Sequence, residues 1–125
     1  MITTTVLPRA AKLAGVAATF VLAMSQAHAH AKLESTTPKA DSTVSSPQLI
    51  QVHFSEAIEV KLSSLKLIAS DGTEVSIMSM NEAKDPSTLS IMPNATLKPG
   101  VYTAAWSIVS DDGHKEKGSF KFNVK

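Results

Sequence analysis

Short runs in which apolar and polar residues alternate are the feature of this sequence that most constrains its fold. Such runs lie within residues 50–54, 65–67, 75–77, 89–91, 102–108 and 120–124. A period of two places alternate side chains on one face of a β-strand, so each run is predicted to be a strand with one buried face. No stretch of useful length carries apolar residues at helical spacing.

Turn-forming residues separate these runs. The dipeptides between them include Asp71-Gly72, Pro93-Asn94 and Pro99-Gly100. Segment 35–48 is rich in Ser, Thr and Pro, and we predict that it is extended, with turns at its prolines. Short half-buried strands that alternate with turns predict an all-β fold, a β-sandwich of about seven strands.

Residues 1–29 carry the pattern of a secretory signal peptide. Two cations precede an apolar tract, 13–24, and the tripeptide 27–29 has small residues on either side of a histidine. The tract is shorter than the roughly 20 residues that a membrane-spanning helix needs. We therefore predict cleavage after Ala29, which leaves residues 30–125 as one small exported domain that is not membrane-embedded.

The charge and the absence of cysteine exclude several classes of function. The chain has 12 Lys and Arg against 11 Asp and Glu, and two of the cations, Arg9 and Lys12, fall in the predicted signal peptide. A nearly neutral domain lacks the basic patch that nucleic-acid binding needs. Because the chain has no cysteine, neither a disulfide nor a thiolate site is available.

The predicted cleavage would give the domain an amino-terminal histidine, His30. Its α-amino and imidazole nitrogens could bind one metal ion together. Farther along the chain, Asp112-Gly113-His114 offers a carboxylate and a second imidazole, and the glycine allows a tight turn that directs both side chains the same way. Nitrogen-rich ligand sets with one carboxylate suit tetragonal Cu(II). We therefore predict a Cu(II) site of His30, Asp112 and His114, provided that the new amino terminus lies against this turn.

Other candidate ligands have simpler structural interpretations. His53 falls on the polar face of its strand, where we expect a solvent-facing side chain. Glu56 follows at the end of that strand; it could hydrogen-bond a metal-bound amine or imidazole, or it could be solvated. Met78, Met80 and Met92 carry thioethers, which favour Cu(I), but methionine is also ordinary core filler.

Two other functions remain open for such a domain. Copper monooxygenases with a histidine brace also begin with His and use a second His on a β-sandwich. Here, however, the short domain leaves little surface for a polymer substrate, and Asp112 would occupy a position that oxygen chemistry needs open. We therefore expect no enzymatic activity. A metal-free, immunoglobulin-like interaction module is the other alternative. Zinc also accepts His and Asp, although the Irving–Williams order favours Cu(II) in a nitrogen-rich site.

Several ordered motifs span residues 30–125. They are His30-Ala-Lys-Leu, Ser35-Thr-Thr-Pro38, Val52-His-Phe-Ser-Glu56, Pro99-Gly-x-Tyr-x-x-x-Trp106, and Asp112-Gly-His114 followed by Gly118-x-Phe-x-Phe122. In this order they resemble the CopC family of periplasmic copper-binding proteins.

This resemblance implies a small Greek-key β-sandwich or barrel, somewhat like a cupredoxin. It implies a Cu(II) site formed by His30, Asp112 and His114, with Glu56 close by. Some members of the family also hold Cu(I) in a methionine-rich loop. Segment 67–80 lacks that dense cluster of Met and His, which implies a member that binds Cu(II) only.

The resemblance also implies a role for the domain in the cell. We expect a monomeric periplasmic protein that buffers or carries copper in copper homeostasis and resistance. Its partners would be the copper ion and an inner-membrane copper transporter of the CopD type.

Overall fold

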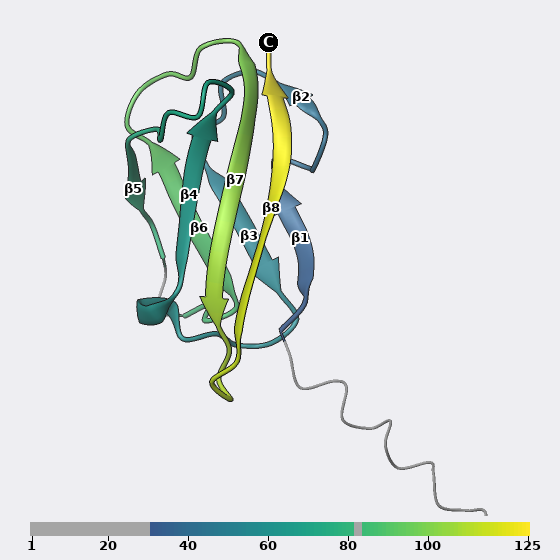
Figure 1. Ribbon diagram of the computed structural model, residues 1–125, viewed down its shortest axis with the longest axis vertical. Helices are drawn as coiled ribbons and strands as arrows, with labels where there is room; N and C mark the ends of the chain where they lie inside the picture. Colours follow the sequence, from purple (N-terminus) through teal and green to yellow (C-terminus); the bar gives the residue numbers. More distant parts are fainter. Residues whose placement is uncertain (1–30, 82–83) are drawn as a thin grey trace, which may run out of the picture.

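The computed structural model describes residues 31–81 and 84–125, in which two four-stranded sheets pack face to face (Figure 1). The first sheet has the order β1 (Leu33–Thr37), β3 (Ile50–Phe54), β6 (Thr88–Pro93), β5 (Ile77–Ser79). The second has the order β2 (Thr43–Val44), β8 (Lys115–Val124), β7 (Gly100–Val109), β4 (Ser64–Ala69). A short 3-10 helix, η2 (Val60–Leu62), precedes β4. The predicted β-sandwich is confirmed.

The alternating apolar residues of both sheets meet in one core. The largest side chains that are fully buried are Phe54, Phe122, Ile50, Leu67, Leu89, Ile91, Ile108, Val52 and Val124. In β3 the residues alternate between buried and half-buried, as a strand with one inward face should. The period of two in the sequence therefore identified the inner faces correctly.

Two strands lie in the part of the sequence where no alternation marked them. β1 pairs antiparallel with β3, and the two-residue β2 pairs parallel with β8, so segment 35–48 joins both sheets. β1 has the sequence Leu-Glu-Ser-Thr-Thr, and none of its residues is fully buried. An edge strand without a buried apolar face carries no period-two signal, which explains why the sequence indicated only an extended segment.

The longest hairpin joins β7 to β8. The two strands pair without interruption from Gly100 opposite Val124 to Val109 opposite Lys115. The turn of this hairpin lies at the end of the sandwich where β1 begins and β3 ends (Figure 1). Residues far apart in the sequence therefore meet at this end.

Trp106 ties the hairpin to the first sheet. Its ring packs edge-on against Phe54, with centroids 5.1 Å apart, and it covers Gly118 on the neighbouring strand. A Cβ atom at Gly118 would lie 2.2 Å from Cζ2 of Trp106, so only glycine fits opposite this ring. Within the residues described, the structure has no helix long and apolar enough to cross a membrane.

Candidate metal centre

The β7–β8 turn positions the predicted Asp112-x-His114 pair. The backbone N–H of Gly113 donates to the carbonyl of Ser110 at 2.8 Å, and the N–H of Ser110 donates to the carbonyl of His114 at 2.8 Å. Gly113 has φ of 89°, in the left-handed region that favours glycine. The glycine therefore closes the turn, as the sequence predicted.

The two side chains of the pair lie together. Nδ1 of His114 is 2.9 Å from Oδ2 of Asp112, and the side chains are 54% and 39% exposed, respectively. Both groups are reachable from solvent at the tip of the hairpin. A carboxylate and an imidazole in this arrangement can both turn toward one ion.

The carboxylate of Asp112 is held in its charged form. The buried hydroxyl of Ser110 donates a hydrogen bond to Oδ1 of Asp112, and His114 bonds to the same carboxylate. These bonds, with that from Ser110 foremost, lower the pKa of Asp112 from 3.8 to about 2. The group is therefore an anion at neutral pH, which suits a ligand of a divalent cation.

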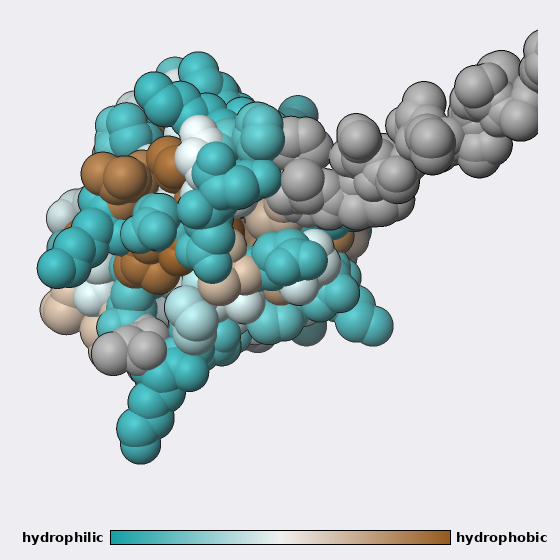
Figure 2. All heavy atoms as spheres, turned by 90° about the horizontal axis from the view of Figure 1, so that it is seen from below, coloured by the Kyte–Doolittle hydropathy of each residue, from teal (hydrophilic) through white to brown (hydrophobic). Residues whose placement is uncertain are grey.

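Glu56 shares a hollow with this turn. The hollow has a volume of about 220 Å³ and is lined by Glu56, Ala57, Ser110, Asp111 and Asp112. A β-bridge between Ile58 and Ser110 fixes the two segments side by side. Figure 2 views this end of the molecule and shows that hydrophilic residues cover most of it. The hollow brings Glu56 close to Asp112, and the carboxylates around it favour a cation.

His30 lies outside the described residues, but the chain that follows it is well fixed. Ala31 is buried in the core, with 2% of its surface exposed. The N–H of Lys32 donates to Oγ of Ser55 at 2.9 Å, and the N–H of Ser55 donates to the carbonyl of Lys32 at 2.8 Å. This pair of bonds holds the segment directly after His30 beside Ser55, the neighbour of Glu56 in the chain.

Within residues 31–81 and 84–125, no group of three His, Cys, Asp or Glu side chains is placed to hold a metal ion. Asp112 and His114 form a close pair, and Glu56 lines the hollow beside them.

The structure places His53 in a hydrogen-bonded environment that the sequence did not indicate. Its side chain lies on the outer face of the first sheet, partly exposed as expected, but Nδ1 is 2.7 Å from Oγ1 of Thr88. Thr88 belongs to the neighbouring strand β6, where it is the register partner of His53. Only the strand pairing brings the two residues together, and no local pattern marks it.

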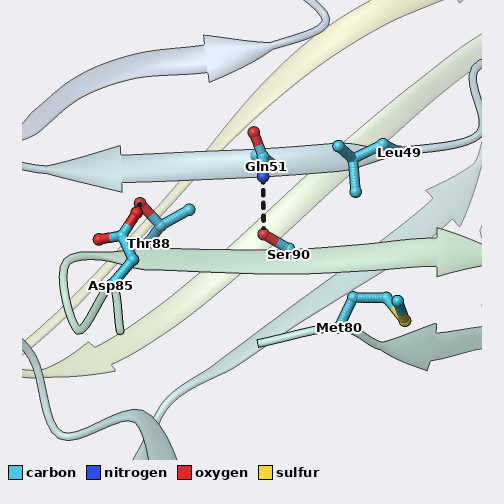
Figure 3. Close-up of a pocket in the computed structure, with 6 residues that line it drawn as sticks. All are labelled: Leu49, Gln51, Met80, Asp85, Thr88 and Ser90. Atoms are coloured by element: carbon cyan, nitrogen blue, oxygen red, sulfur yellow. Dashed lines mark hydrogen bonds between the residues drawn. The ribbon is translucent and has the colours of Figure 1, made fainter. Parts of the chain in front are cut away.

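The methionines do not serve as core filler at the positions considered. Met78 lies opposite Met92 in the β5–β6 pair, and Met78 and Met80 are exposed. Met80 and Leu49 line one end of a pocket on this sheet, which has Gln51 and Ser90 at its centre (Figure 3). The thioethers therefore lie on the outer side of this sheet, and none of them belongs to the β7–β8 turn.

Comparison with known proteins places the chain in a family. The family model described as "CopC domain" matches residues 33–125. "Copper resistance protein C" of Pseudomonas syringae pv. tomato is 39% identical over 111 residues, which cover 84% of this chain and 88% of that protein. The crystal structure of PcoC, a methionine-rich copper resistance protein from Escherichia coli, has a TM-score of 0.71 and 37% identity, and the match covers 78% of this chain and 100% of PcoC.

A longer protein also contains a similar region. "Copper transport protein CutJ" of Bacillus subtilis (strain 168) is 29% identical over 98 residues, which cover 77% of this chain but 18% of that protein. The motifs in the sequence, the two-sheet sandwich and the match over residues 33–125 agree. This chain belongs to the CopC family.

Proposed function

We propose that this chain is a periplasmic Cu(II)-binding protein that buffers or carries copper in copper homeostasis and resistance. In this proposal residues 1–29 are removed as a signal peptide. The amine and imidazole of His30 then bind Cu(II) together with Asp112 and His114. Glu56 lies beside these ligands, where its carboxylate can accept a hydrogen bond from the amine or an imidazole.

The observation that carries the proposal is the anchoring of Lys32 on Ser55. Two backbone hydrogen-bonding groups of Lys32 are held by Ser55, and the next residue, Glu56, lines the hollow that Asp112 also lines. Since Ala31 is buried, the chain at this point cannot swing freely away from the sandwich. This attachment supports the proposal, because it fixes the chain from Ala31 onward beside the segment that lines the hollow.

The chemistry of the ligands favours Cu(II). Three nitrogen donors and one carboxylate form a set that suits a tetragonal ion, and the Irving–Williams order gives Cu(II) the highest affinity among the common divalent metals. The carboxylate offsets part of the charge of the ion. The amine has an ordinary pKa of about 7.7–8.0, so it must lose a proton when it binds the metal.

Family membership supports the biological setting. Several relatives that match most of this chain are named for copper resistance, which favours copper as the ion and disfavours the metal-free interaction module. CutJ is named for copper transport and contains a similar region within a much longer chain. This supports a role beside a copper transporter, and we propose an inner-membrane protein of the CopD type as that partner. We propose no enzymatic activity.

The test compares the processed protein, which begins at His30, with a form that retains a methionine before His30. Added methionine removes the free histidyl amine and leaves every other ligand in place. Electron paramagnetic resonance of the processed protein with one equivalent of Cu(II) should report several nitrogen donors. The extended form should lose one of these donors, and competition with a chelator should give a much lower affinity.

The outcome that would overturn this assignment is equal affinity in the two forms. Mass analysis of the exported protein is a second check, because any first residue other than His30 would exclude the amine as a ligand. Asp112→Asn and His114→Ala in the processed protein should each weaken Cu(II) binding, while Ser119→Ala, on the exposed side of β8, serves as the matched control.

A further inference from the structure

A β-bulge directs Glu34 toward His53 on the outer face of the first sheet. Leu33 pairs with Phe54 and Ser35 pairs with His53, so Glu34 is an extra residue in β1 with no register partner. Its carboxylate Oε1 lies 3.6 Å from Nε2 of His53. Bulges of this kind commonly redirect a side chain beside a functional site.

The second ring nitrogen of His53 is held by a short chain of hydrogen bonds. The hydroxyl of Thr88 donates to Oδ2 of Asp85 at 2.8 Å, and Nδ1 of His53 lies 2.7 Å from that same hydroxyl oxygen. Figure 3 shows Asp85 beside Thr88 at one end of the pocket on this sheet. A hydroxyl has one hydrogen, and Asp85 receives it, so Nδ1 of His53 must be the donor to Thr88.

This hydrogen-bond order fixes the tautomer of the neutral ring. When Nδ1 carries the hydrogen, Nε2 presents a lone pair, and this lone pair faces the carboxylate of Glu34. Two acceptors at 3.6 Å do not form a direct hydrogen bond, whose usual range for N and O is about 2.7–3.2 Å. A cation between them would satisfy both groups.

The separation also matches two ligands of one metal ion. Bonds of about 2.0–2.2 Å from a transition metal to a histidine nitrogen and a carboxylate oxygen place these atoms about 3.4 Å apart in tetrahedral geometry. The observed 3.6 Å is within a small side-chain movement of this value, and the side chains of His53 and Glu34 are 41% and 55% exposed. A carboxylate that orients a metal-binding histidine through its other nitrogen is a recurrent feature of metal sites, and Asp85 acts here through Thr88.

We propose that Glu34 and His53 form a second site for a divalent transition-metal ion, with Asp85 and Thr88 as the residues that position the imidazole. The structure supplies two ligands from the protein, so water completes the coordination and the affinity is lower than that of a site with more protein ligands. Zn(II), which takes tetrahedral geometry, fits this separation, and Cu(II) would compete for the same ligands because of its place in the Irving–Williams order. This site does not depend on His30, Asp112 or His114.

The test uses the processed protein with Asp112→Ala and His114→Ala, so that the hairpin ligands are absent. Long-range proton–nitrogen NMR spectra of the imidazoles should first show His53 as the Nδ1–H tautomer. Titration with Zn(II) should then shift the nitrogen resonance of Nε2 in His53. Replacing Glu34 by Gln removes the ligand charge at constant size and should weaken this binding by about tenfold or more.

Two further variants test whether neighbouring residues contribute to Zn(II) binding or whether His53 binds the ion by itself. Asp85→Asn should weaken Zn(II) binding at His53 by roughly tenfold and disturb the tautomer, because the residue acts through Thr88. Glu74→Gln removes a carboxylate elsewhere on the surface and should change nothing. Unchanged affinity in Glu34→Gln, an Nε2–H tautomer in the metal-free protein, or no shift of His53 at millimolar Zn(II) would overturn the proposal. Because the hairpin ligands are absent from these proteins, any of these results leaves the proposed Cu(II) site untouched.

Discussion

At the scale of single residues, Ser110 lowers the pKa of Asp112 in the β7–β8 turn. Its buried hydroxyl donates to Asp112, and this bond is the largest cause of the lowered pKa of that carboxyl group. The same residue pairs with Ile58, so it also fixes the hollow beside Glu56. Ser110 therefore acts in two ways: its hydroxyl lowers the pKa of Asp112, and its backbone bridge to Ile58 fixes the position of the turn on the sandwich.

Ser110→Ala should raise the pKa of Asp112 from about 2 toward 3.8, although the bond to His114 keeps it below that value. The carbon resonance of the carboxyl group, followed by NMR against pH in the metal-free protein, measures this change. Ser119→Ala is the control, because its side chain lies on the exposed side of β8. An unchanged pKa of Asp112 in Ser110→Ala would mean that the hydroxyl does not stabilise the carboxylate.

The lowered pKa of Asp112 also determines whether acid stabilises or destabilises the fold through this group. The folded-state pKa of Asp112 lies below its ordinary value of 3.8, so the ionised carboxylate stabilises the fold above that pH. This contribution is lost as the pH falls through about 2. Urea denaturation at pH 4 and at pH 2 measures the free energy of unfolding. Between these pH values it should fall less in Ser110→Ala than in the unaltered protein.

At the scale of elements, the pairing of β1 with β3 fixes the first described segment of the chain on the sandwich. β1 is an edge strand without fully buried residues, and the pairing with β3 holds it in place. Beyond β1, the bonds between Lys32 and Ser55 extend this attachment by a further residue toward Ala31. β1 and the Lys32–Ser55 bonds therefore tether the chain as far as Ala31, the residue next to the proposed ligand His30.

Ser55→Ala should loosen that tether without affecting the core. It removes the hydroxyl that accepts from the N–H of Lys32, a hydrogen bond whose net contribution is about 0.5–1.5 kcal/mol. If the whole effect appears in metal binding, Cu(II) affinity of the processed protein falls roughly twofold to tenfold. Competition with a chromophoric chelator gives the affinity, with Ser119→Ala as the control. An equal loss in both variants would argue against the tether.

At the scale of the whole molecule, the two sheets bring distant segments to one end. β3 delivers Ser55 and Glu56 from the first sheet, and the β7–β8 turn delivers Asp112 and His114 from the second. An ion that bridges the amino terminus and this turn would connect both sheets. Binding to the folded state alone must then stabilise the whole sandwich.

Cu(II) should raise the melting temperature of the processed protein. At a free concentration 100 times Kd, the folded state gains about 2.7 kcal/mol, which for a domain of this size shifts Tm by roughly 10–20 °C. Circular dichroism at a strand-sensitive wavelength measures the shift, and a chelator should reverse it. His114→Ala should lose most of the increase. The same increase in His114→Ala would place the dominant copper site elsewhere.

The sequence by itself determined the features that depend on near neighbours. Alternation along 50–54 and 102–108 identified the inward faces, since side chains two residues apart share a face of a strand. The pair Asp112 and His114 was identified because both residues lie in one turn that a glycine closes. These inferences needed only local backbone geometry.

The tertiary structure alone decided which distant groups meet. Glu56 shares a hollow with Asp112 because an isolated β-bridge between Ile58 and Ser110 joins the segment after β3 to the segment after β7. Glu34 reaches His53 because the register shifts by a residue in β1, and Thr88 bonds to His53 because β3 pairs with β6. Strand register is set by the burial of whole faces and by the pairing of edges, so no local pattern of residues encodes it.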